Sequence, residues 1–477
     1  MLFVFLIYFA VLILISRLVS GTDNDAFFMG NKKSPWYVVA FGMIGASFSG
    51  VTFIGVPGMV MSGDMTYLQM CIGFFFGYLI VAFLLLPLYY RLGLTSIYGY
   101  LDKRFGRVSY KTGAWFFIIS KLLSSAAKFY VVCELLQRCV FDGLGVPYVL
   151  TVVVTLAMIW LYTQRSGIKA LVWTDALQTL CLLVALLLIM WRVTDMLGMS
   201  VSDVLSAVRS DSHSRVFVFD DFVSRQNFWK QFLSGVFVVI VMTGLDQDMM
   251  QKNLTCGDLR SAKKDMCAYG VMFIPVNALF LALGVMLLML YARLGMPLPA
   301  KGDDLLTGVA ATGMMGDAVV AVFTVGVMAS AFSSADSALT AMSTSFCIDV
   351  LDMNVSRADD TDVARRRKVH LSFVLLFLCF TLVFHYVGSG SVIDLIYTIV
   401  GYTYGPLLGL YSFGLFTRRV PKQRLVPVVA LLSPVLCWVT DSVTSACFGY
   451  KFGYELLMLN GMLTFAGLWA LSVRKER

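Results

Sequence analysis

Residues 36–58 read WYVVAFGMIGASFSGVTFIGVPG and form an apolar segment long enough to cross a lipid bilayer. Small and hydroxyl residues crowd the middle of this segment: Gly42, Gly45, Ser47, Ser49, Gly50 and Thr52. Such residues weaken a helix, and an unwound stretch exposes backbone carbonyls that can coordinate a cation. Alternatively, they form a small-residue face of the GxxxG type that packs against another helix. The segment predicts a membrane span with either a break or a close helix contact at its centre.

The whole chain has the composition of a polytopic membrane protein. Of its 477 residues, 59% are hydrophobic and 14% are charged, whereas a soluble domain carries about 25% charged residues. The N-terminal segment lacks a basic region and a cleavage site, so we expect it to remain as an uncleaved first span. We predict an all-α integral membrane protein with about thirteen transmembrane helices. The apolar segments lie at about 2–19, 36–60, 66–90, 109–140, 146–163, 168–194, 227–251, 266–292, 305–349, 369–388, 391–417, 425–447 and 453–473. The segment 305–349 is too long for one crossing, so part of it must tilt or lie at the interface.

Lysine and arginine are distributed unevenly among the connections between the predicted spans. Of these 37 residues, 26 fall in one alternating set of connections and 9 in the other, while Lys121 and Lys128 lie inside a span. Because Lys and Arg gather on the cytoplasmic side, we predict a cell membrane protein (inner or plasma membrane) with its N-terminus outside and its C-terminus in the cytoplasm. The net charge of +8 is then a signal of topology. We infer the lipid bilayer as a partner, no nucleic acid, and no obligate protein partner.

A second span has an interruption like that of the first segment. Residues 235–254 read GVFVVIVMTGLDQDMMQKNL, with Thr243, Gly244 and Asp246 close together. The two interrupted spans are the second and the seventh in the chain, so they lie five spans apart. Interruptions at corresponding places in two halves of a transporter mark a binding site, which favours breaks over packing faces.

The sharpest signal is a stripe of hydroxyl residues within 327–346, VMASAFSSADSALTAMSTSF. Ser330, Ser333, Ser334 and Ser337 recur at the spacing of one helix face. Hydroxyl and carbonyl oxygens are hard ligands, which suit Na⁺ better than a soft metal. Hydroxyls that bond back to their own helix are the simpler interpretation. The carboxylate of Asp336 at the edge of the stripe favours a functional site, because a charge inside a span is costly.

Three further charged residues lie inside predicted spans. Asp175 is a second intramembrane carboxylate, unless it lies at the interface near Lys169 as an anchor. Lys121 and Lys128 are seven residues apart, so they share a helix face and suggest an anionic group on a substrate. Snorkelling of these lysines to the membrane surface is the alternative. The chain has no nucleophile elbow, P-loop or HExxH motif, so we do not expect an enzyme.

Taken together, these segments resemble the sodium:solute symporter family, which includes the sodium/galactose, sodium/proline and bacterial sialic acid symporters. The resemblance covers nearly the whole chain and rests on SFSGVTFIG at 47–55, TDALQ at 174–178, GLDQDMMQKNL at 244–254 and ASAFSSADSALT at 329–340. It implies a five-plus-five inverted repeat of the leucine-transporter type over residues 34–417, with repeat one at about 34–197 and repeat two at about 227–417. Residues 1–20 would be a peripheral first helix, and residues 425–477 two peripheral helices with a short cytoplasmic tail.

The resemblance also implies sodium as the coupling ion. Its main site would use the carbonyls of Gly45, Phe48 and Ser330 and the hydroxyls of Ser333 and Ser334. Some members bind a second sodium between the corresponding aspartate and hydroxyls, which here would be Asp175 with Ser333, Ser337 and Asp336. Position 336 is often a hydroxyl residue in such members, so the aspartate leaves open whether this second site binds sodium or a proton.

The solute pocket would lie at the midplane of the membrane between the broken spans. Candidate residues are Ser47, Ser49, Thr52, Gln69, Thr243 and Gln247, with Lys121 or Lys128 for an anionic group. The lysine that contacts sugar in the galactose symporter falls on Phe273, which argues against an identical sugar site. The implied function is sodium-coupled import of a small organic solute by alternating access, either an anionic (carboxylated) solute or a sugar. Two alternatives are a proton-coupled carrier that uses Asp175 and Asp336, and a transporter-like solute sensor.

Overall fold

The computed structural model describes residues 2–19, 24–48, 50–353, 360–387 and 392–474, and these residues are mostly helical. A short antiparallel pair of strands, β1 (Arg419–Pro421) and β2 (Ser472–Arg474), joins two connections near the C-terminus. The helices of the first half are α1 (Leu2–Val19), α2 (Asn24–Met29), α3 (Trp36–Ser47), α4 (Gly50–Gly63), α5 (Tyr67–Ile80), α6 (Leu86–Leu92), α7 (Gly99–Arg104), α8 (Arg107–Leu136), α9 (Tyr148–Met196) and α10 (Val201–Ser210). Those of the second half are α11 (Phe228–Val239), α12 (Gln247–Asn253), α13 (Leu259–Leu294), α14 (Leu305–Ala311), α15 (Asp317–Ser345), α16 (Asp360–Val387), α17 (Val392–Thr403), α18 (Gly405–Phe416), α19 (Val426–Phe448) and α20 (Leu456–Ala470).

Many of these helices are suited to a membrane. Within the described residues, seven helices are long and apolar enough to cross a bilayer, or eight if a bent pair of helices counts as one span. Five shorter apolar helices accompany them. The chain is therefore a multi-pass membrane protein, while the count of about thirteen spans stays a prediction. Of the long predicted segment 305–349, the structure makes two elements, the short α14 and the long α15.

Both of the segments with crowded small residues are broken. The helix α3 ends at Ser47, Phe48 has the non-helical backbone angles φ −80° and ψ 90°, and α4 begins at Gly50. In the second segment, α11 runs into a π-helical turn, η7 (Ile240–Gly244), and α12 then continues at an angle of 69°. Asp246, the second of the two residues between them, caps the new helix by accepting a hydrogen bond from the Asp248 amide at 2.8 Å.

A third change of direction separates two predicted spans. It lies inside α9 at Gly167, whose φ of +50° and ψ of −142° are not helical. A β-carbon at this position would lie 2.5 Å from the Phe27 ring. Glycine is required there both for the backbone angle and for the close approach of α2.

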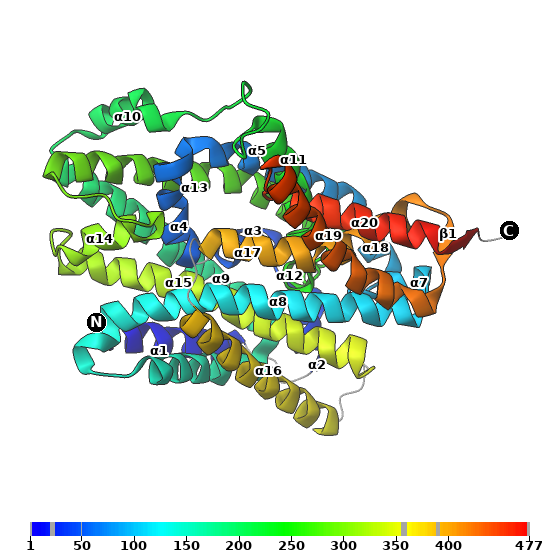
Figure 1. Ribbon diagram of the computed structural model, residues 1–477. Helices are drawn as coiled ribbons and strands as arrows, with labels where there is room; N and C mark the ends of the chain where they lie inside the picture. The colour runs from blue at the N-terminus through cyan, green and yellow to red at the C-terminus, as the bar shows by residue number, and fades with distance from the viewer. Residues whose placement is uncertain (1, 20–23, 49, 354–359, 388–391, 475–477) are drawn as a thin grey trace.

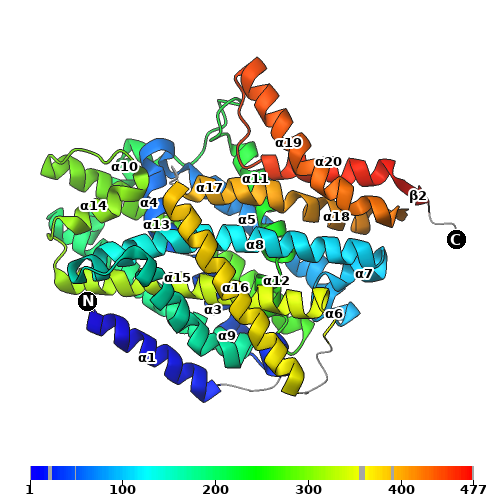
Figure 2. The same ribbon diagram turned by 60° about the horizontal axis from the view of Figure 1, so that its bottom comes forward.

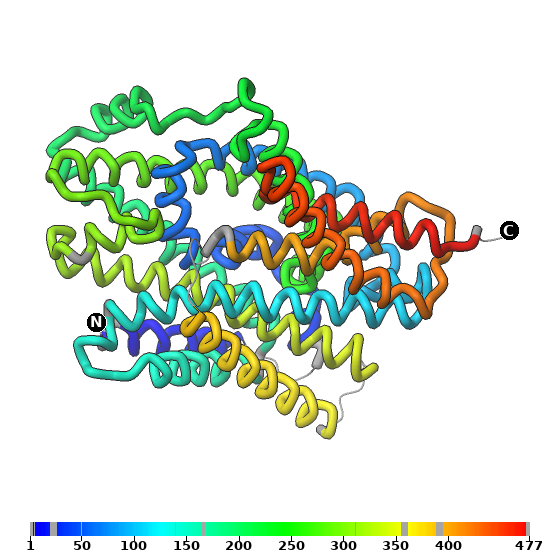
Figure 3. The backbone as a smooth tube through the Cα atoms, in the orientation of Figure 1, coloured from blue at the N-terminus to red at the C-terminus, as the bar shows by residue number. Residues whose placement is uncertain are grey.

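The breaks lie inside the bundle, and other helices cover it from two sides. Figure 1 shows α8 running the length of the bundle, with α3, α12 and α17 near its middle. In the tube of Figure 3, the blue segments of α3 and α4 meet at an angle in this central region. Figures 1 and 2 place α1 and α16 on one side and α19 and α20 on another. The described helix α1 begins at the opposite end of the bundle from β1 and β2 (Figure 1).

A buried amide supports the junction between α17 and α18. The Asn460 side chain on α20 donates hydrogen bonds to the carbonyls of Gly401 and Tyr402, both at 2.9 Å. These carbonyls belong to the last turn of α17, where a helix leaves its acceptors without partners in the same helix. The neighbouring Ser433 hydroxyl on α19 donates to the backbone carbonyl of Asn460 at 2.9 Å, so three helices share the polar contact.

We expect Asn460→Ala to lower the thermal unfolding midpoint of the purified protein. The substitution leaves two buried carbonyls without donors, at a cost of about 1–3 kcal/mol for each unsatisfied group. Thr440→Ala on α19 is the matched control, because the Thr440 hydroxyl bonds only to the carbonyl of Leu436 in its own helix. Equal midpoints for the two variants would show that Asn460 does not stabilise the junction.

Candidate solute and sodium sites

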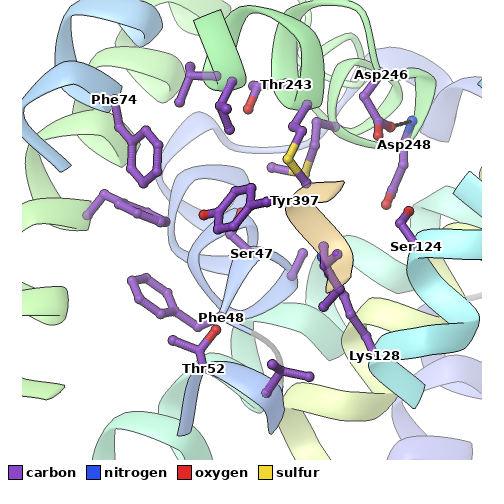
Figure 4. Close-up of a pocket in the computed structure, with 18 of the residues that line it drawn as sticks. Ser47, Phe48, Thr52, Phe74, Ser124, Lys128, Thr243, Asp246, Asp248 and Tyr397 are labelled. Carbon is purple, nitrogen blue, oxygen red and sulfur yellow. Dashed lines mark hydrogen bonds between the residues drawn. The ribbon is translucent and has the colours of Figure 1, made fainter. Parts of the chain in front are cut away.

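A cavity of about 130 Å³ lies between the two broken segments and the helices around them. Its lining comes from α3 and α4, α5, α8, α11 with its continuation to α12, α13 and α17. Much of the lining is aromatic: Phe48, Tyr67, Phe74, Tyr78, Tyr269, Phe273, Tyr397 and Tyr404. Four charged residues also line it, namely Lys121, Lys128, Asp246 and Asp248. Figure 4 shows Phe48 and Phe74 on one side of the cavity and Lys128, Asp246 and Asp248 on the other. The cavity is therefore apolar on one side and charged on the opposite side.

The first of the two predicted lysines is already neutralised. The Lys121 ammonium on α8 lies 3.0 Å from a carboxylate oxygen of Asp246 and 2.7 Å from one of Asp248. The Asp246 carboxylate also accepts a hydrogen bond from the Tyr404 hydroxyl at 2.7 Å. The expectation that Lys121 is an unpaired cation for a solute is therefore wrong, because two carboxylates from the break in the second segment hold it.

The second lysine is available to a solute. Lys128 lies two turns further along α8 and lines the same cavity. Within the part of the chain that the structure describes, its ammonium has no hydrogen bond and no ion pair. In Figure 4 its side chain extends from α8 into the cavity. A partly buried ammonium without a partner favours an anionic group beside it.

The other predicted solute residues divide into two groups. Ser47, Thr52 and Thr243 line the cavity, and the Ser47 hydroxyl is hydrogen bonded to the Tyr269 hydroxyl. The residues Gln69 and Gln247 do not line it. The Gln69 side-chain amide donates to the backbone carbonyls of Thr66 and Gln226 and accepts from the Val218 amide. The Gln247 side-chain amide donates to the Thr95 carbonyl and accepts from the Ile97 amide. Both glutamines therefore fix loops and are left out of the solute site. Ser49 lies outside the described residues.

Two of the predicted main sodium ligands are hydroxyls of α15, and one of them contacts the end of α3. The Ser334 hydroxyl on α15 donates a hydrogen bond to the Ala46 carbonyl on α3 at 3.2 Å. The Ser333 hydroxyl donates to a carboxylate oxygen of Asp175 at 2.6 Å. Each hydroxyl uses its hydrogen in this way and keeps oxygen lone pairs for a cation. The Ser330 hydroxyl instead donates within its own helix, to the Val327 carbonyl at 2.8 Å, and among the described residues it forms no hydrogen bond with α3 or Asp175.

The end of α3 is held in place by α9. The Thr179 hydroxyl donates to the Phe41 carbonyl and accepts from the Gly45 amide, both at 2.9 Å. A β-carbon at Gly45 would lie 2.3 Å from the Thr179 hydroxyl oxygen, so the contact requires glycine. The broken end of α3 thus presents its last carbonyls in a fixed position, and hard oxygen ligands of this kind fit sodium.

The predicted second cation site already contains an ammonium group. The Lys252 side chain on α12 lies 2.8 Å from the Asp175 carboxylate, and both side chains are buried. Asp336 accepts hydrogen bonds from the Tyr162 hydroxyl at 2.6 Å and the Ser337 hydroxyl at 3.3 Å. Where the resemblance implied Asp175, Asp336 and Ser337 around a metal ion or a proton, the structure places a lysine of the chain itself.

Sequence reasoning missed Lys252, Asp248 and Tyr404 in these sites. The predicted span at 227–251 ends before Lys252, and this boundary places the lysine in a cytoplasmic connection. One signal was available, because Asp248 and Lys252 are spaced i, i+4 and could face the same side of a helix. No pattern in the sequence connects Tyr404 to this region.

Comparison with known proteins identifies the family. The family model named Sodium:solute symporter family matches residues 27–424. The chain belongs to the sodium:solute symporter family. Its relatives include the human sodium/iodide cotransporter, 25% identical over 436 residues, which are 86% of this chain and 65% of that protein. The human sodium-coupled monocarboxylate transporter 2 is 28% identical over 239 residues, 50% of this chain and 38% of that protein. The sodium/sialic acid symporter NanT of Aliivibrio fischeri is 24% identical over 464 residues, 92% of this chain and 87% of that protein.

Two solved structures show the fold that these proteins share with the chain. A substrate-bound, outward-open Na⁺-coupled sialic acid symporter has a TM-score of 0.81 and 19% identity, and the match covers 99% of this chain and 98% of that one. The transporter Mhp1 in a closed conformation has a TM-score of 0.57 and 13% identity, with 95% of each chain covered. The chain spans 65% and 38% of the lengths of the iodide and monocarboxylate relatives. The family and these relatives are transporters, in agreement with the expectation that the chain is not an enzyme.

We expect Lys121→Met to destabilise the whole protein. The variant leaves Asp246 and Asp248 buried without their cation, and breaking a buried ion pair in this way costs about 3–5 kcal/mol. The measurement is the thermal unfolding midpoint in detergent, read from the monodisperse fraction after heating.

The control for this substitution lies on the same helix. Lys111→Met removes a lysine that is 38% exposed and lies 3.6 Å from Asp352, and exposed pairs contribute only about 0–1 kcal/mol. A Lys121→Met protein as stable as the Lys111→Met protein would contradict a structural role for the Lys121 pairs.

Proposed function

We propose that the chain is a sodium-coupled symporter that moves a compact organic anion across the membrane by alternating access. The observation that carries this proposal is Lys128, a cation without a partner among the described residues, which faces a cavity with aromatic side chains on its opposite side. Such a cavity suits a solute with a carboxylate at one end and an apolar group at the other. Membership of the sodium:solute symporter family supports the sodium coupling.

The solutes in the names of the relatives favour an anion. One relative is named for iodide, one for monocarboxylates and one for sialic acid, and each of these is an anion at neutral pH. The cavity volume of about 130 Å³ favours the smaller of them. An engineered protein cavity of about 150 Å³ holds one benzene molecule. A small monocarboxylate therefore fits the cavity better than a nine-carbon sugar acid or a neutral hexose.

The sodium ion would be held by the carbonyls of Gly45, Phe48 and Ser330 and the hydroxyls of Ser333 and Ser334. When bound, the ion would supply a positive charge that attracts the carbonyl oxygens at the end of α3 and the hydroxyl oxygens of α15 and so holds the two helices together. Ser47 and Phe48 lie at this helix end and also line the solute cavity. A sodium ion that orders them prepares the cavity, and by linkage the solute raises sodium affinity by the same factor.

Import follows if both species are released on the cytoplasmic side. A membrane potential that is negative inside contributes about 2.3 kcal/mol per charge per 100 mV to the entry of sodium. The proposed movement is a rocking of the two inverted repeats, 34–197 and 227–417, in a cell membrane with the N-terminus outside and the C-terminus in the cytoplasm. Of the two alternatives, the proton-coupled carrier is less favoured because Asp175 is already paired with Lys252. A solute sensor would bind but not exchange solute, so counterflow in proteoliposomes separates it from a symporter.

We expect Ser334→Ala to abolish sodium-stimulated uptake in proteoliposomes. The variant removes a hydroxyl ligand between α15 and the end of α3. Ser330→Ala is a close control on the same helix face, because the Ser330 hydroxyl bonds to its own helix and the backbone carbonyl is kept. Sodium dependence that survives in the Ser334→Ala protein would refute the assignment of this site.

We expect Lys128→Gln to weaken the binding of anionic solutes by at least about tenfold. A hydrogen bond to a charged group contributes about 1.5–3 kcal/mol, and 1.4 kcal/mol is a factor of ten in affinity. Thermal-shift titrations would compare small monocarboxylates, iodide, sialic acid and neutral amides, with and without sodium. Bound solute raises the midpoint by mass action.

Two outcomes decide this test. Lys128→Arg keeps the charge and should retain most of the affinity for anions. Stabilisation of the wild type by neutral sugars or amides, but by none of the anions, would contradict the proposed solute class.

A further inference from the structure

Two carboxylates meet in the buried contact between α9 and α15. Asp175 accepts from the Ser333 hydroxyl at 2.6 Å, and Asp336 accepts from the Tyr162 hydroxyl at 2.6 Å. Both carboxylates are fully buried. Hydroxyl groups can stabilise a carboxylate, but two negative charges in a region of low dielectric require a cation nearby.

A cation of the chain itself lies at this cluster. The Lys252 ammonium is 2.8 Å from Asp175 and 3.8 Å from Asp248, and its side chain is 1% exposed. Asp336 lies one turn along α15 from Ser333, whose hydroxyl donates to Asp175. From Asp248 the pairs continue to Lys121 at 2.7 Å and from there to Asp246 at 3.0 Å. A continuous row of alternating charges thus connects the α9–α15 contact to the solute cavity.

The position of Lys252 is fixed by the elements around α12. The 69° bend before α12 directs this helix into the bundle. Gln247 at its start binds the backbone of 95 and 97, each at 3.0 Å. Gln251 donates to the Phe28 carbonyl at 2.8 Å and to the Thr344 hydroxyl at 3.1 Å. These hydrogen bonds hold α12 to the neighbouring elements and so fix the position of the Lys252 side chain beside Asp175.

We propose that Lys252 is the permanent cation of the Asp175–Asp336 cluster, so that the cluster takes up no metal ion. The Lys252 ammonium forms an ion pair with the Asp175 carboxylate at 2.8 Å and so already supplies the positive charge that a sodium ion would bring. A second monovalent cation beside it would experience repulsion in a region that screens charge poorly. The inference rests on the proposed function, since it assigns one sodium ion to each transport cycle. The Lys252 ammonium on α12 then takes the place of the positive charge of a second sodium ion.

Sodium binding to the purified full-length chain tests this directly. In a thermal-shift titration with NaCl against choline chloride, the wild type should saturate as a single site with a Hill coefficient near one. Ser334→Ala should lose the whole sodium-dependent shift. The Ser334→Ala/Lys252→Met protein should regain a sodium-dependent shift, because Asp175 and Asp336 are then open to the ion. The matched Ser334→Ala/Lys252→Arg protein, which keeps the cation, should not regain it.

Several results would overturn the inference. One is two sodium ions per solute in wild-type proteoliposomes, measured from paired ²²Na⁺ and solute fluxes. Another is a sodium-dependent shift of the unfolding midpoint that persists in the Ser334→Ala protein and disappears in the Ser334→Ala/Asp175→Asn protein. A folded Ser334→Ala/Lys252→Met protein without any sodium shift is a third. If that protein does not fold, the wild-type stoichiometry decides between one ion and two.

Failure of the proposed function gives a different result. If the wild type shows neither a sodium-dependent shift nor sodium-dependent uptake, sodium coupling at Ser334 is wrong. A sodium shift acquired by Lys252→Met would support the present inference even then, because that measurement requires binding and not transport.

Discussion

A charge inside a membrane protein is stable only beside an opposite charge, and this constraint organises the centre of the structure. Four aspartates and two lysines, Asp175, Lys252, Asp248, Lys121, Asp246 and Asp336, stand in one connected region between α8, α9, α12 and α15. The row requires α12 to turn away from α11, since a straight helix would carry Lys252 out of the bundle. The break in the second segment and the ion pairs therefore depend on each other.

The same dependence links the two proposed sites. The Lys121 pairs form part of the charged side of the cavity, and Asp175 receives a hydrogen bond from Ser333, one of the proposed sodium ligands. Among the described residues, the ion pairs of Lys121, Asp248 and Lys252 lie between these ends. These ion pairs place the two proposed sites in contact with each other through side chains.

Much of this could be predicted from the sequence, because hydrophobic runs and small-residue clusters are local patterns. Spacing predicts the stripe around Ser333 and Ser334. The break in the segment at 36–58 is predicted by its small residues together with the matching interruption five spans later, and the family by the combination of these segments. Pairings across the bundle could not be predicted. The ion pairs of Lys121 could not be predicted because its partners lie more than a hundred residues away in the sequence, so the lysine is expected to face a solute. Gln69 and Gln247 are expected in the cavity because a polar residue in an apolar segment suggests a binding site. In both cases the decisive partner was a distant backbone or carboxylate group.

The contact of Asn460 has a consequence for what counts as the transport core. The predicted core ends at residue 417, yet the last carbonyls of α17 receive their donors from α20, beyond that boundary. Tyr404 follows directly after α17 and holds Asp246 at the cavity. A fragment that ended at residue 417 would therefore leave the end of α17 without these two donors.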